Sequence, residues 1–598
     1  MDRTFENEDF GSRWRTLLLY ATAGVIALSR LAAVSRSLWD WDEALFCLAI
    51  GEYDVTQHHP HPPGFPVYVA MAKVISLALP AFRSYQLING LAACALFPLL
   101  FLLARELRFN FTTSYCGALL YAFLPNVWFF GGTAFSDVSG IALILAACLL
   151  LLRGREHPDE YVAGGLILGL AVGIRPQALL FAAVPSLIAT WVQWQRSRTR
   201  VFAAILGGLL VVAICYGGAA LASYSIAGYF DTAAAVKDYV RKVDSFLSPG
   251  RPSLASLAPL FLADPMRSGK LGWLITGLAA VGTIAALLRR DRRVSLLLGM
   301  FLPFALFAWL MLDLNSVTRY SVAYLPMYAL LAAHAPFALT PHRFHRITTV
   351  VAVSLLLILA GRAAWWTLPA LQEVRRHESP TARAGTWLRD HATGPVYADG
   401  GLGAFVSLYL PGREIVTIRT ERDLPVSDIH PDALLVVEGS TDADIHFIRE
   451  RGRIFDIARR RYFEVSVTDV EGVPHFREGW YDPEGEGEQA WRWMSARSRT
   501  LLPARNEPAT LSLDLEPVGA AGAGAVIEVA LNGALLDRFV CPSRCVRRWD
   551  VIPRANQPNE LTIVTNRVVN PARSGISHDR RDLGLRLMDV SWSSKRAR

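Results

Sequence analysis

Long apolar runs dominate the first two thirds of the chain. Between residues 16 and 366, stretches of about 15 to 22 mainly apolar residues follow one another, close to the ~20 residues that a helix needs to cross a bilayer. After about residue 369 such runs are absent. The pattern predicts eleven membrane-spanning helices, near 16–35, 86–104, 112–131, 137–152, 160–174, 177–194, 201–222, 271–288, 294–312, 321–339 and 347–366.

Composition supports a multi-pass membrane protein. Of the 598 residues, 52% are hydrophobic and only 19% are charged, which is too apolar for a soluble protein of this size. The net charge of +8 comes from short basic clusters between apolar runs. Membrane topology explains such clusters, so we expect membrane lipids as surroundings and no nucleic acid partner.

Basic clusters also predict the orientation. If residues 1–15 are cytoplasmic, the inside loops hold the clusters at 105–109, 153–157, 196–200, 289–293 and 342–346, as the positive-inside rule expects. Counting the apolar stretch 65–79 as a span would export four of these five clusters. We therefore expect an interfacial or re-entrant helix there. If the first apolar run were a cleaved signal peptide, its removal would leave the topology of the other spans unchanged.

The predicted topology places the protein in the plasma (inner) membrane, with the region after residue 369 in the periplasm. It also gathers ionisable residues at the periplasmic face of this membrane. Such groups are costly in a membrane, and they tend to face a cavity and carry function. Carboxylates bind metals or take protons, and arginines hold phosphate by forked hydrogen bonds. The group comprises Asp40, Asp42, Glu43, His58, His59, His61, Asp137, Arg175, Arg319 and Tyr320.

Each of these residues also has a simpler interpretation. Asp42 and Glu43 are also compatible with a solvated loop beside tryptophan anchors, and Asp137 with a helix N-cap. Arg175 and Arg319 are also compatible with snorkelling at the ends of spans. The three histidines in "HHPHPP" suggest zinc, but the prolines oppose their convergence and no cysteine lies nearby. For His58 and His59 a stiff, polyproline-like loop is the favoured interpretation.

The order of these elements resembles a known arrangement. An Asp-Glu pair (Asp42 and Glu43) follows the first span, and His61 begins "HPPGFPVY". Arg175 lies in "GIRPQ" and Arg319 with Tyr320 in "TRYSVAYLP". Over about residues 16 to 335 the chain resembles the GT-C superfamily of glycosyltransferases, in particular the protein O-mannosyltransferases and lipid A aminoarabinose transferases. Asp137 lies where such proteins often carry a second acidic residue.

The resemblance implies a GT-C-like membrane domain over 16–368 that transfers a sugar from a polyprenyl-phosphate carrier. The acceptor would be a protein, lipid or glycan hydroxyl on the outer face, and direct attack would invert the anomeric centre. Asp42 would be the general base. Glu43 and Asp137 would orient the acceptor, and a divalent cation such as Mg²⁺ or Mn²⁺ on Asp42 and Asp137 stays possible.

The other site residues receive roles from the same chemistry. Arg175 and Arg319 would stabilise the leaving phosphate, and His61 and Tyr320 would contact the donor. The long external loop 223–270 predicts an amphipathic helix that caps the cavity. Its basic residues Lys237, Arg241 and Lys242 attract lipid phosphate or form a solvated face.

The region after the last span predicts two further units. Residues 369–475 alternate helical and short apolar segments, as in a small α/β unit with a partly parallel sheet. Residues 476–598 show short alternating strands, as in a β-sandwich, and resemble jelly-roll modules of polysaccharide enzymes. Trp491 and Trp493 would then stack on a sugar or pack in a core. Outside the cytoplasm, Cys541 and Cys545 in "CPSRC" would form a disulfide.

The main alternative function is a transporter or flippase for lipid-linked saccharides, which would also place arginines and acids in a membrane cavity. Such proteins typically show internal repeats and charges near the middle of the bilayer. This sequence shows no repeat, and its charges collect at one face. A membrane-anchored carbohydrate-binding protein would need only one or two spans.

Overall fold

The computed structural model of the protein describes residues 3–418, 432–439, 443, 445–458, 462–470, 473–481, 484, 491–518, 524–555, 557–575 and 579–594. The chain forms two compact units. One comprises Met1–Ser379 and Glu450–Arg461, and the other comprises Pro380–Arg449 and Tyr462–Arg598. Residues 450–461, which the sequence assigns to an α/β unit, therefore cluster with the helical unit.

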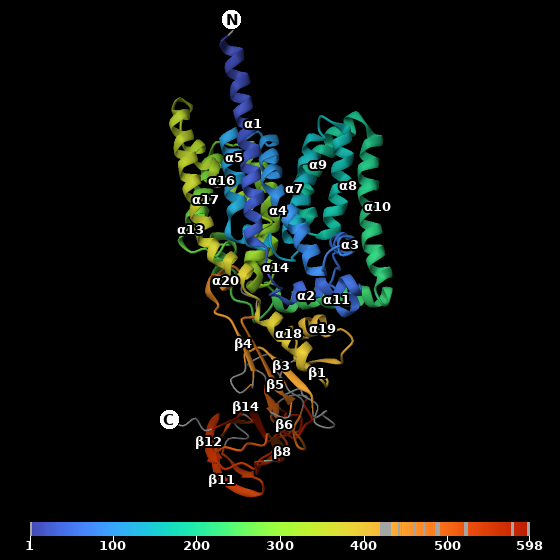
Figure 1. The fold of residues 1–598 in the computed structure, drawn as a ribbon, viewed down its shortest axis with the longest axis vertical. Helices are drawn as coiled ribbons and strands as arrows, with labels where there is room; N and C mark the ends of the chain where they lie inside the picture. Colours follow the sequence, from blue (N-terminus) through green and yellow to red (C-terminus); the bar gives the residue numbers. More distant parts are fainter. Residues whose placement is uncertain are drawn as a thin grey trace. The chain divides into compact units, whose positions relative to one another are not determined.

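The first unit is helical, and its main helices run side by side (Figure 1). Its elements are α1 (Arg3–Arg30), η1 (Leu31–Ala33), α2 (Trp41–Gly51), η2 (Val55–Gln57), α3 (Pro66–Ile75), α4 (Ala81–Glu106), α5 (Phe111–Phe123), α6 (Pro125–Phe130), α7 (Asp137–Arg153), α8 (Pro158–Ile174), α9 (Ala178–Arg196), α10 (Arg198–Ala222), α11 (Ile226–Tyr239), η3 (Val240–Asp244), α12 (Leu254–Ala258), η4 (Pro259–Ala263), α13 (Lys270–Leu288), α14 (Arg292–Met311), η5 (Leu314–Ser316), α15 (Val317–Ser321), α16 (Leu325–Leu339), η6 (His342–Phe344), α17 (His345–Arg376) and α20 (Gly452–Ile457).

The predicted multi-pass helical membrane region is confirmed. Within the described residues, seven helices are long and apolar enough to cross a membrane, or eight if Leu314–Ser321 and Leu325–Leu339, bent by 61°, count as one span. The other three predicted spans are shorter helices. The first is broken at Pro125 into α5 and α6, and α7 and α8 have 17 residues each. The total of eleven spans stays a prediction.

Short helices lie across one end of the bundle. The labels α2, α3 and α11 all fall at this end in Figure 1. The predicted interfacial helix at 65–79 is α3, which has 10 residues and a length of about 15 Å, half of the hydrocarbon thickness. Tyr229 of α11 donates a hydrogen bond to the Pro63 carbonyl at 3.0 Å. The helix predicted in the external loop therefore packs on the His-Pro segment.

Close packing between α8 and α10 fixes the end of α8. A Cβ added at Gly169 would lie 2.8 Å from the Gly208 carbonyl oxygen, and one added at Gly208 would lie 2.8 Å from that of Gly165. Small residues at such contacts let two helix backbones approach closely. Tyr216 of α10 also donates to the Val172 carbonyl. These contacts position Arg175, which directly follows α8.

The second unit begins with a mixed sheet, as the sequence predicts. Strands β1, β2 and β3 pair in parallel, and β5 pairs antiparallel with β3 and β4, in the order β2-β1-β3-β5-β4. Two helices belong to this part. The elements are α18 (Pro380–His391), β1 (Val396–Asp399), α19 (Leu402–Tyr409), β2 (Ile415–Ile418), β3 (Leu434–Val437), β4 (Ile445–Ile448) and β5 (Glu464–Asp469).

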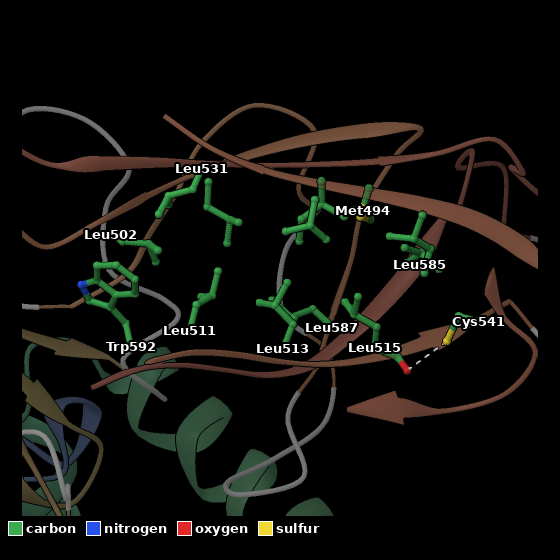
Figure 2. Close-up of a cluster of buried hydrophobic side chains, with 14 of the residues drawn as sticks. Met494, Leu502, Leu511, Leu513, Leu515, Leu531, Cys541, Leu585, Leu587 and Trp592 are labelled. Carbon is green, nitrogen blue, oxygen red and sulfur yellow. Dashed lines mark hydrogen bonds between the residues drawn. The ribbon is translucent and has the colours of Figure 1, made fainter. Parts of the chain in front are cut away.

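Two antiparallel sheets follow, in the orders β11-β10-β13-β8-β6 and β12-β9-β14-β7. Apolar residues from both sheets form one buried cluster, because alternate residues of each strand point inward. Figure 2 shows the β9 side chains Leu511, Leu513 and Leu515 in this core. The strands are β6 (His475–Phe476), β7 (Arg492–Trp493), β8 (Arg497–Leu502), β9 (Ala509–Pro517), β10 (Ala525–Leu531), β11 (Ala534–Cys541), β12 (Cys545–Val551), β13 (Asn559–Thr565) and β14 (Leu585–Ser594).

Two sequence features of this last region have clear positions. A disulfide joins Cys541 to Cys545 and closes the turn between β11 and β12. The Arg586 guanidinium lies 4.9 Å from the ring of Trp491 and 5.7 Å from that of Trp493. Both tryptophans therefore pack on an arginine, and sugar stacking by either ring stays a prediction.

Candidate functional site

The site is built around the first turn of α2. Asp40 caps this helix by accepting a hydrogen bond from the Asp42 amide at 3.0 Å, and Glu43 completes a capping box. Such reciprocal caps satisfy backbone donors that the helix itself leaves free. Asp42 and Glu43 are both buried. The cap therefore holds two carboxylates at the start of a helix, away from water.

Glu43 is bound to the backbone. Its Oε2 accepts hydrogen bonds from the amides of Trp39 and Asp40 at 2.8 and 3.2 Å, and its Oε1 accepts one from Ala134 at 3.0 Å. The carboxylate thus ties α2 to the segment that precedes α7. The catalytic role predicted for Glu43 is untested, and this geometry gives it a positioning function.

Asp42 contacts a cation and an imidazole. Its Oδ2 lies 2.5 Å from Arg319 Nη1, and its Oδ1 lies 3.7 Å from His61 Nδ1. Arg319 belongs to α15, which lies 277 residues further along the chain. The fold therefore brings together three residues that the sequence singled out separately.

Asp137 contacts both arginines. Its Oδ2 lies 2.7 Å from Arg175 Nη2 and 3.7 Å from Arg319 Nε. Asp137 is the first residue of α7, whose N-cap is Ser136, so it does not occupy the N-cap position considered above. A Cβ added at Gly140 would lie 3.2 Å from Arg175 Cδ. Glycine one turn after Asp137 therefore leaves room for the arginine stem.

Aromatic rings surround these charges. The Arg319 guanidinium lies 4.7 Å from the Phe135 ring and 5.1 Å from the Tyr320 ring, and its Nη2 donates to the Tyr320 hydroxyl at 3.3 Å. The rings of Phe65 and His61 meet edge to face, with centroids 4.9 Å apart. Apolar rings exclude water and lower the local dielectric, which strengthens the interactions between charges.

His61 is neutral at physiological pH. Burial lowers its pKa to about 4, Asp42 opposes this shift, and Arg319 and Arg175 add to it. Burial also lowers the pKa values of His58 and His59. The His59 backbone pairs with that of Asp54, and the Asp54 carboxylate accepts hydrogen bonds from the Thr56 side chain and amide. Among the described residues, His61 is the one of these three histidines whose side chain contacts Asp42 of the site.

Other residues of the site escaped the sequence analysis. Asn89 of α4 donates to the carbonyls of Thr133 and Phe135 at 2.8 and 2.6 Å and accepts from the Ser139 hydroxyl at 2.7 Å. It thereby fixes the turn that carries Asp137. The only signal in the sequence was an amide within an apolar run. Phe65 and Phe135 each lie within four residues of a predicted site residue, which was the available signal for them.

The arrangement does not suit a resident metal ion. Two carboxylates, Asp42 and Asp137, meet two guanidinium groups, so the charges balance. Among the described residues, no group of three or more His, Cys, Asp or Glu side chains is placed to hold a metal. The suggested Mg²⁺ or Mn²⁺ on Asp42 and Asp137 stays untested, and no step below depends on it.

Comparison with known proteins gives similarity at the level of structure only. No protein-family model matches the sequence, and no curated protein matches it. The oligosaccharyltransferase AglB from Archaeoglobus fulgidus, in complex with an inhibitory peptide and a dolichol-phosphate, is 12% identical with a TM-score of 0.44. That match covers 68% of this chain and 65% of AglB.

Two further solved structures are similar. ArnT from Cupriavidus metallidurans, bound to undecaprenyl phosphate, is 14% identical with a TM-score of 0.46, over 76% of this chain and 97% of ArnT. The arabinofuranosyltransferase AftD from Mycobacteria is 12% identical with a TM-score of 0.46, over 98% of this chain and 59% of AftD. The chain is thus similar in structure to these three transferases, and it spans about two thirds of the length of AglB.

The depressed pKa of His61 predicts a pH-dependent stability. An unfolded histidine titrates near pH 6.5, whereas folded His61 takes up a proton only near pH 4. Stability should therefore fall as the pH decreases from about 6.5 to 4, because only the unfolded chain binds the proton in that window. Thermal melts of the detergent-solubilised protein should show His61→Gln losing less stability than wild type over this range. The exposed His157→Gln should behave like wild type, and equal pH dependence in all three proteins would contradict the assignment.

Proposed function

We propose that the protein is an integral membrane glycosyltransferase. It moves a sugar from a polyprenyl-phosphate donor to an acceptor hydroxyl on the outer face of the membrane. The observation that carries this proposal is the convergence of Asp42, His61, Asp137, Arg175 and Arg319 from five separate segments into one buried cluster. The motif resemblance described above supports the same reaction class.

The two arginines suit the phosphate of the donor. Each guanidinium is paired with a carboxylate, through Arg319–Asp42 and Arg175–Asp137. A phosphate that enters between them competes for the same donors, because guanidinium groups bind phosphate and carboxylate with the same forked geometry. Phosphate binding would then free Asp42 from its strongest contact, so that the base becomes available when the donor is bound.

The chemical step follows from this exchange. A bond forms between the acceptor oxygen and the anomeric carbon, and the bond from that carbon to the phosphate oxygen breaks. The acceptor proton passes to Asp42, which acts as general base. Negative charge grows on the departing polyprenyl phosphate, where Arg175 and Arg319 stabilise it. Direct attack inverts the anomeric centre.

Neutral His61 completes the site. Its Nδ1 lies 3.7 Å from Asp42 Oδ1, and no hydrogen-bond partner for that atom occurs among the described residues. A neutral imidazole offers one donor and one acceptor. We assign it to a sugar hydroxyl or to the phosphate, where it adds a hydrogen bond without a third positive charge. Tyr320, beside Arg319, would line the same donor position.

Replacing Asp42 tests the proposed chemistry. Asp42→Asn keeps the size of the side chain and removes the base, so transfer should fall by roughly 10²- to 10⁴-fold. The measurement is transfer of radiolabelled sugar from defined polyprenyl-phosphate donors by the full chain in proteoliposomes. Asp231→Asn, an exposed carboxylate on α11, serves as the matched control and should transfer like wild type.

Two outcomes of this assay would contradict the proposal. Transfer by Asp42→Asn at the wild-type rate would remove the catalytic assignment. Movement of lipid-linked sugar across the bilayer by the wild type, without transfer, would instead establish the flippase alternative.

The proposed topology predicts which residues a membrane-impermeant thiol reagent labels in intact cells. Asp42 is buried, so exposed positions give the clearer test. In a chain whose free cysteines are replaced, Asp231→Cys should be labelled from outside. Glu156→Cys, in a basic loop assigned to the cytoplasm, should be labelled only after permeabilisation. The reverse pattern would overturn the orientation.

A further inference from the structure

An open cavity lies in the helical unit, and none of its lining residues belongs to the charged cluster. Its volume is about 460 Å³, within the range of ~300 to 1,000 Å³ typical of small-ligand sites. The walls come from α12, η4, the turn that follows η4, the start of α13, and the helices α17 and α20. The side chains that matter most are Asp264, Arg267, Trp273, Trp366 and Asp456.

The cavity is connected to the helix that carries Arg319. Ser321 of α15 donates a hydrogen bond to the Pro265 carbonyl at 3.1 Å, and Thr318 donates to the Ile457 carbonyl. Pro265 lies in the turn that forms one wall, and Ile457 ends α20, which forms another. Arg319 of the same short helix contacts Asp42. Residues of one short helix therefore contact both the proposed base and the segments that carry the cavity lining.

Several hydrogen bonds hold the walls in place. Tyr324, just before α16, and Tyr328 of α16 donate to the carbonyls of Phe261 and Leu262 in η4, both at 2.7 Å. Arg453 of α20 lies 3.8 Å from the Trp366 ring and donates to the Trp366 carbonyl. The cavity is thus formed by anchored segments, which favours a built site over a packing gap.

The lining matches the chemistry of a saccharide. Indole rings such as those of Trp273 and Trp366 offer flat apolar faces for the C–H surfaces of sugar rings. The carboxylates of Asp264 and Asp456 accept hydrogen bonds from hydroxyl groups, and Arg267 donates them.

The charges argue against a phosphate. Two carboxylates, Asp264 and Asp456, line the cavity with one guanidinium, that of Arg267, so an anionic head group would meet a net negative wall. Asp264 also accepts from the amides of Ser268 and Gly269 at the start of α13. A role for Trp273 as a tryptophan anchor at the membrane interface would not require the neighbouring carboxylates.

We infer that this cavity binds the non-reacting part of a saccharide acceptor, next to the site where its hydroxyl reacts. The inference rests on the proposed glycosyltransferase function and narrows the acceptor from protein, lipid or glycan to a glycan. The hydroxyl that reacts would reach Asp42 past α15, while the preceding sugar units stack on Trp273 and Trp366.

Binding is tested with the full chain in phosphatidylcholine nanodiscs. The probe is a printed array of neutral oligosaccharides of two to six units of glucose, mannose, galactose, rhamnose or arabinose. Wild type should bind at least one of them. Trp273→Ala and the isosteric Asp456→Asn should each weaken that binding about tenfold or more, or about 1.4 kcal/mol. Trp365→Ala, an exposed neighbour of Trp366 outside the cavity lining, should bind like wild type.

The saccharide that binds should also act as acceptor, with a KM raised by Trp273→Ala at unchanged kcat. Absence of binding to every printed saccharide, or full binding by both variants, would overturn the inference. So would binding of phosphatidylglycerol vesicles that depends on Arg267 when no saccharide binds. Saccharide binding without transfer by the wild type would contradict the proposed function and leave the binding site standing.

Discussion

The burial of two carboxylates against two guanidinium groups ties together the four segments of the helical unit that carry them. The side chains of Asp42, Asp137, Arg175 and Arg319 are 6%, 4%, 16% and 10% exposed. An unpaired buried ion costs several kcal/mol, and removing one partner of a buried pair typically costs about 3–5 kcal/mol. If one of the four segments that carry these groups moved away alone, it would leave a buried ion without its partner. The ion pairs act as a common attachment point for α2, α7, α15 and the end of α8.

The surrounding polar groups keep this attachment point in one geometry. Glu43 joins the start of α2 to Ala134, and Asn89 holds the turn before α7 through Thr133 and Phe135. Because these contacts involve the backbone, they fix Asp42 and Asp137 without using the two catalytic candidates themselves. A site that is closed by ion pairs and held by its scaffold is suited to exchange one anion for another. In the proposed mechanism the incoming phosphate replaces carboxylates as the partner of the arginines. The same short helix, α15, also forms hydrogen bonds to segments that line the cavity proposed for the acceptor.

The sequence predicted the members of the charged cluster because charged residues beside membrane spans are costly and therefore few. Asp42, His61, Asp137, Arg175 and Arg319 were among the ten residues selected on that ground, but their pairing required the fold. Glu43 shows the limit, since neighbouring residues on a helix point in different directions. The Asp40-x-x-Glu43 capping box was the signal for its structural role. The count of spans depended on breaks at Pro125 and between α15 and α16. The placement of residues 450–461 depended on long-range contacts, such as that of Arg453 with Trp366, which no local pattern reveals.

The most direct test of the central claim separates charge balance from catalysis at the Arg175–Asp137 pair. Melting temperature and sugar transfer should be measured for Arg175→Gln, Asp137→Asn and the double variant in the same proteoliposomes. If the buried pair fixes the structure, each single variant should lose stability by about 3–5 kcal/mol. The double variant should then recover most of that loss, while all three fail to transfer sugar. Losses of stability that simply add in the double variant, or transfer at the wild-type rate by any of the three, would contradict the account.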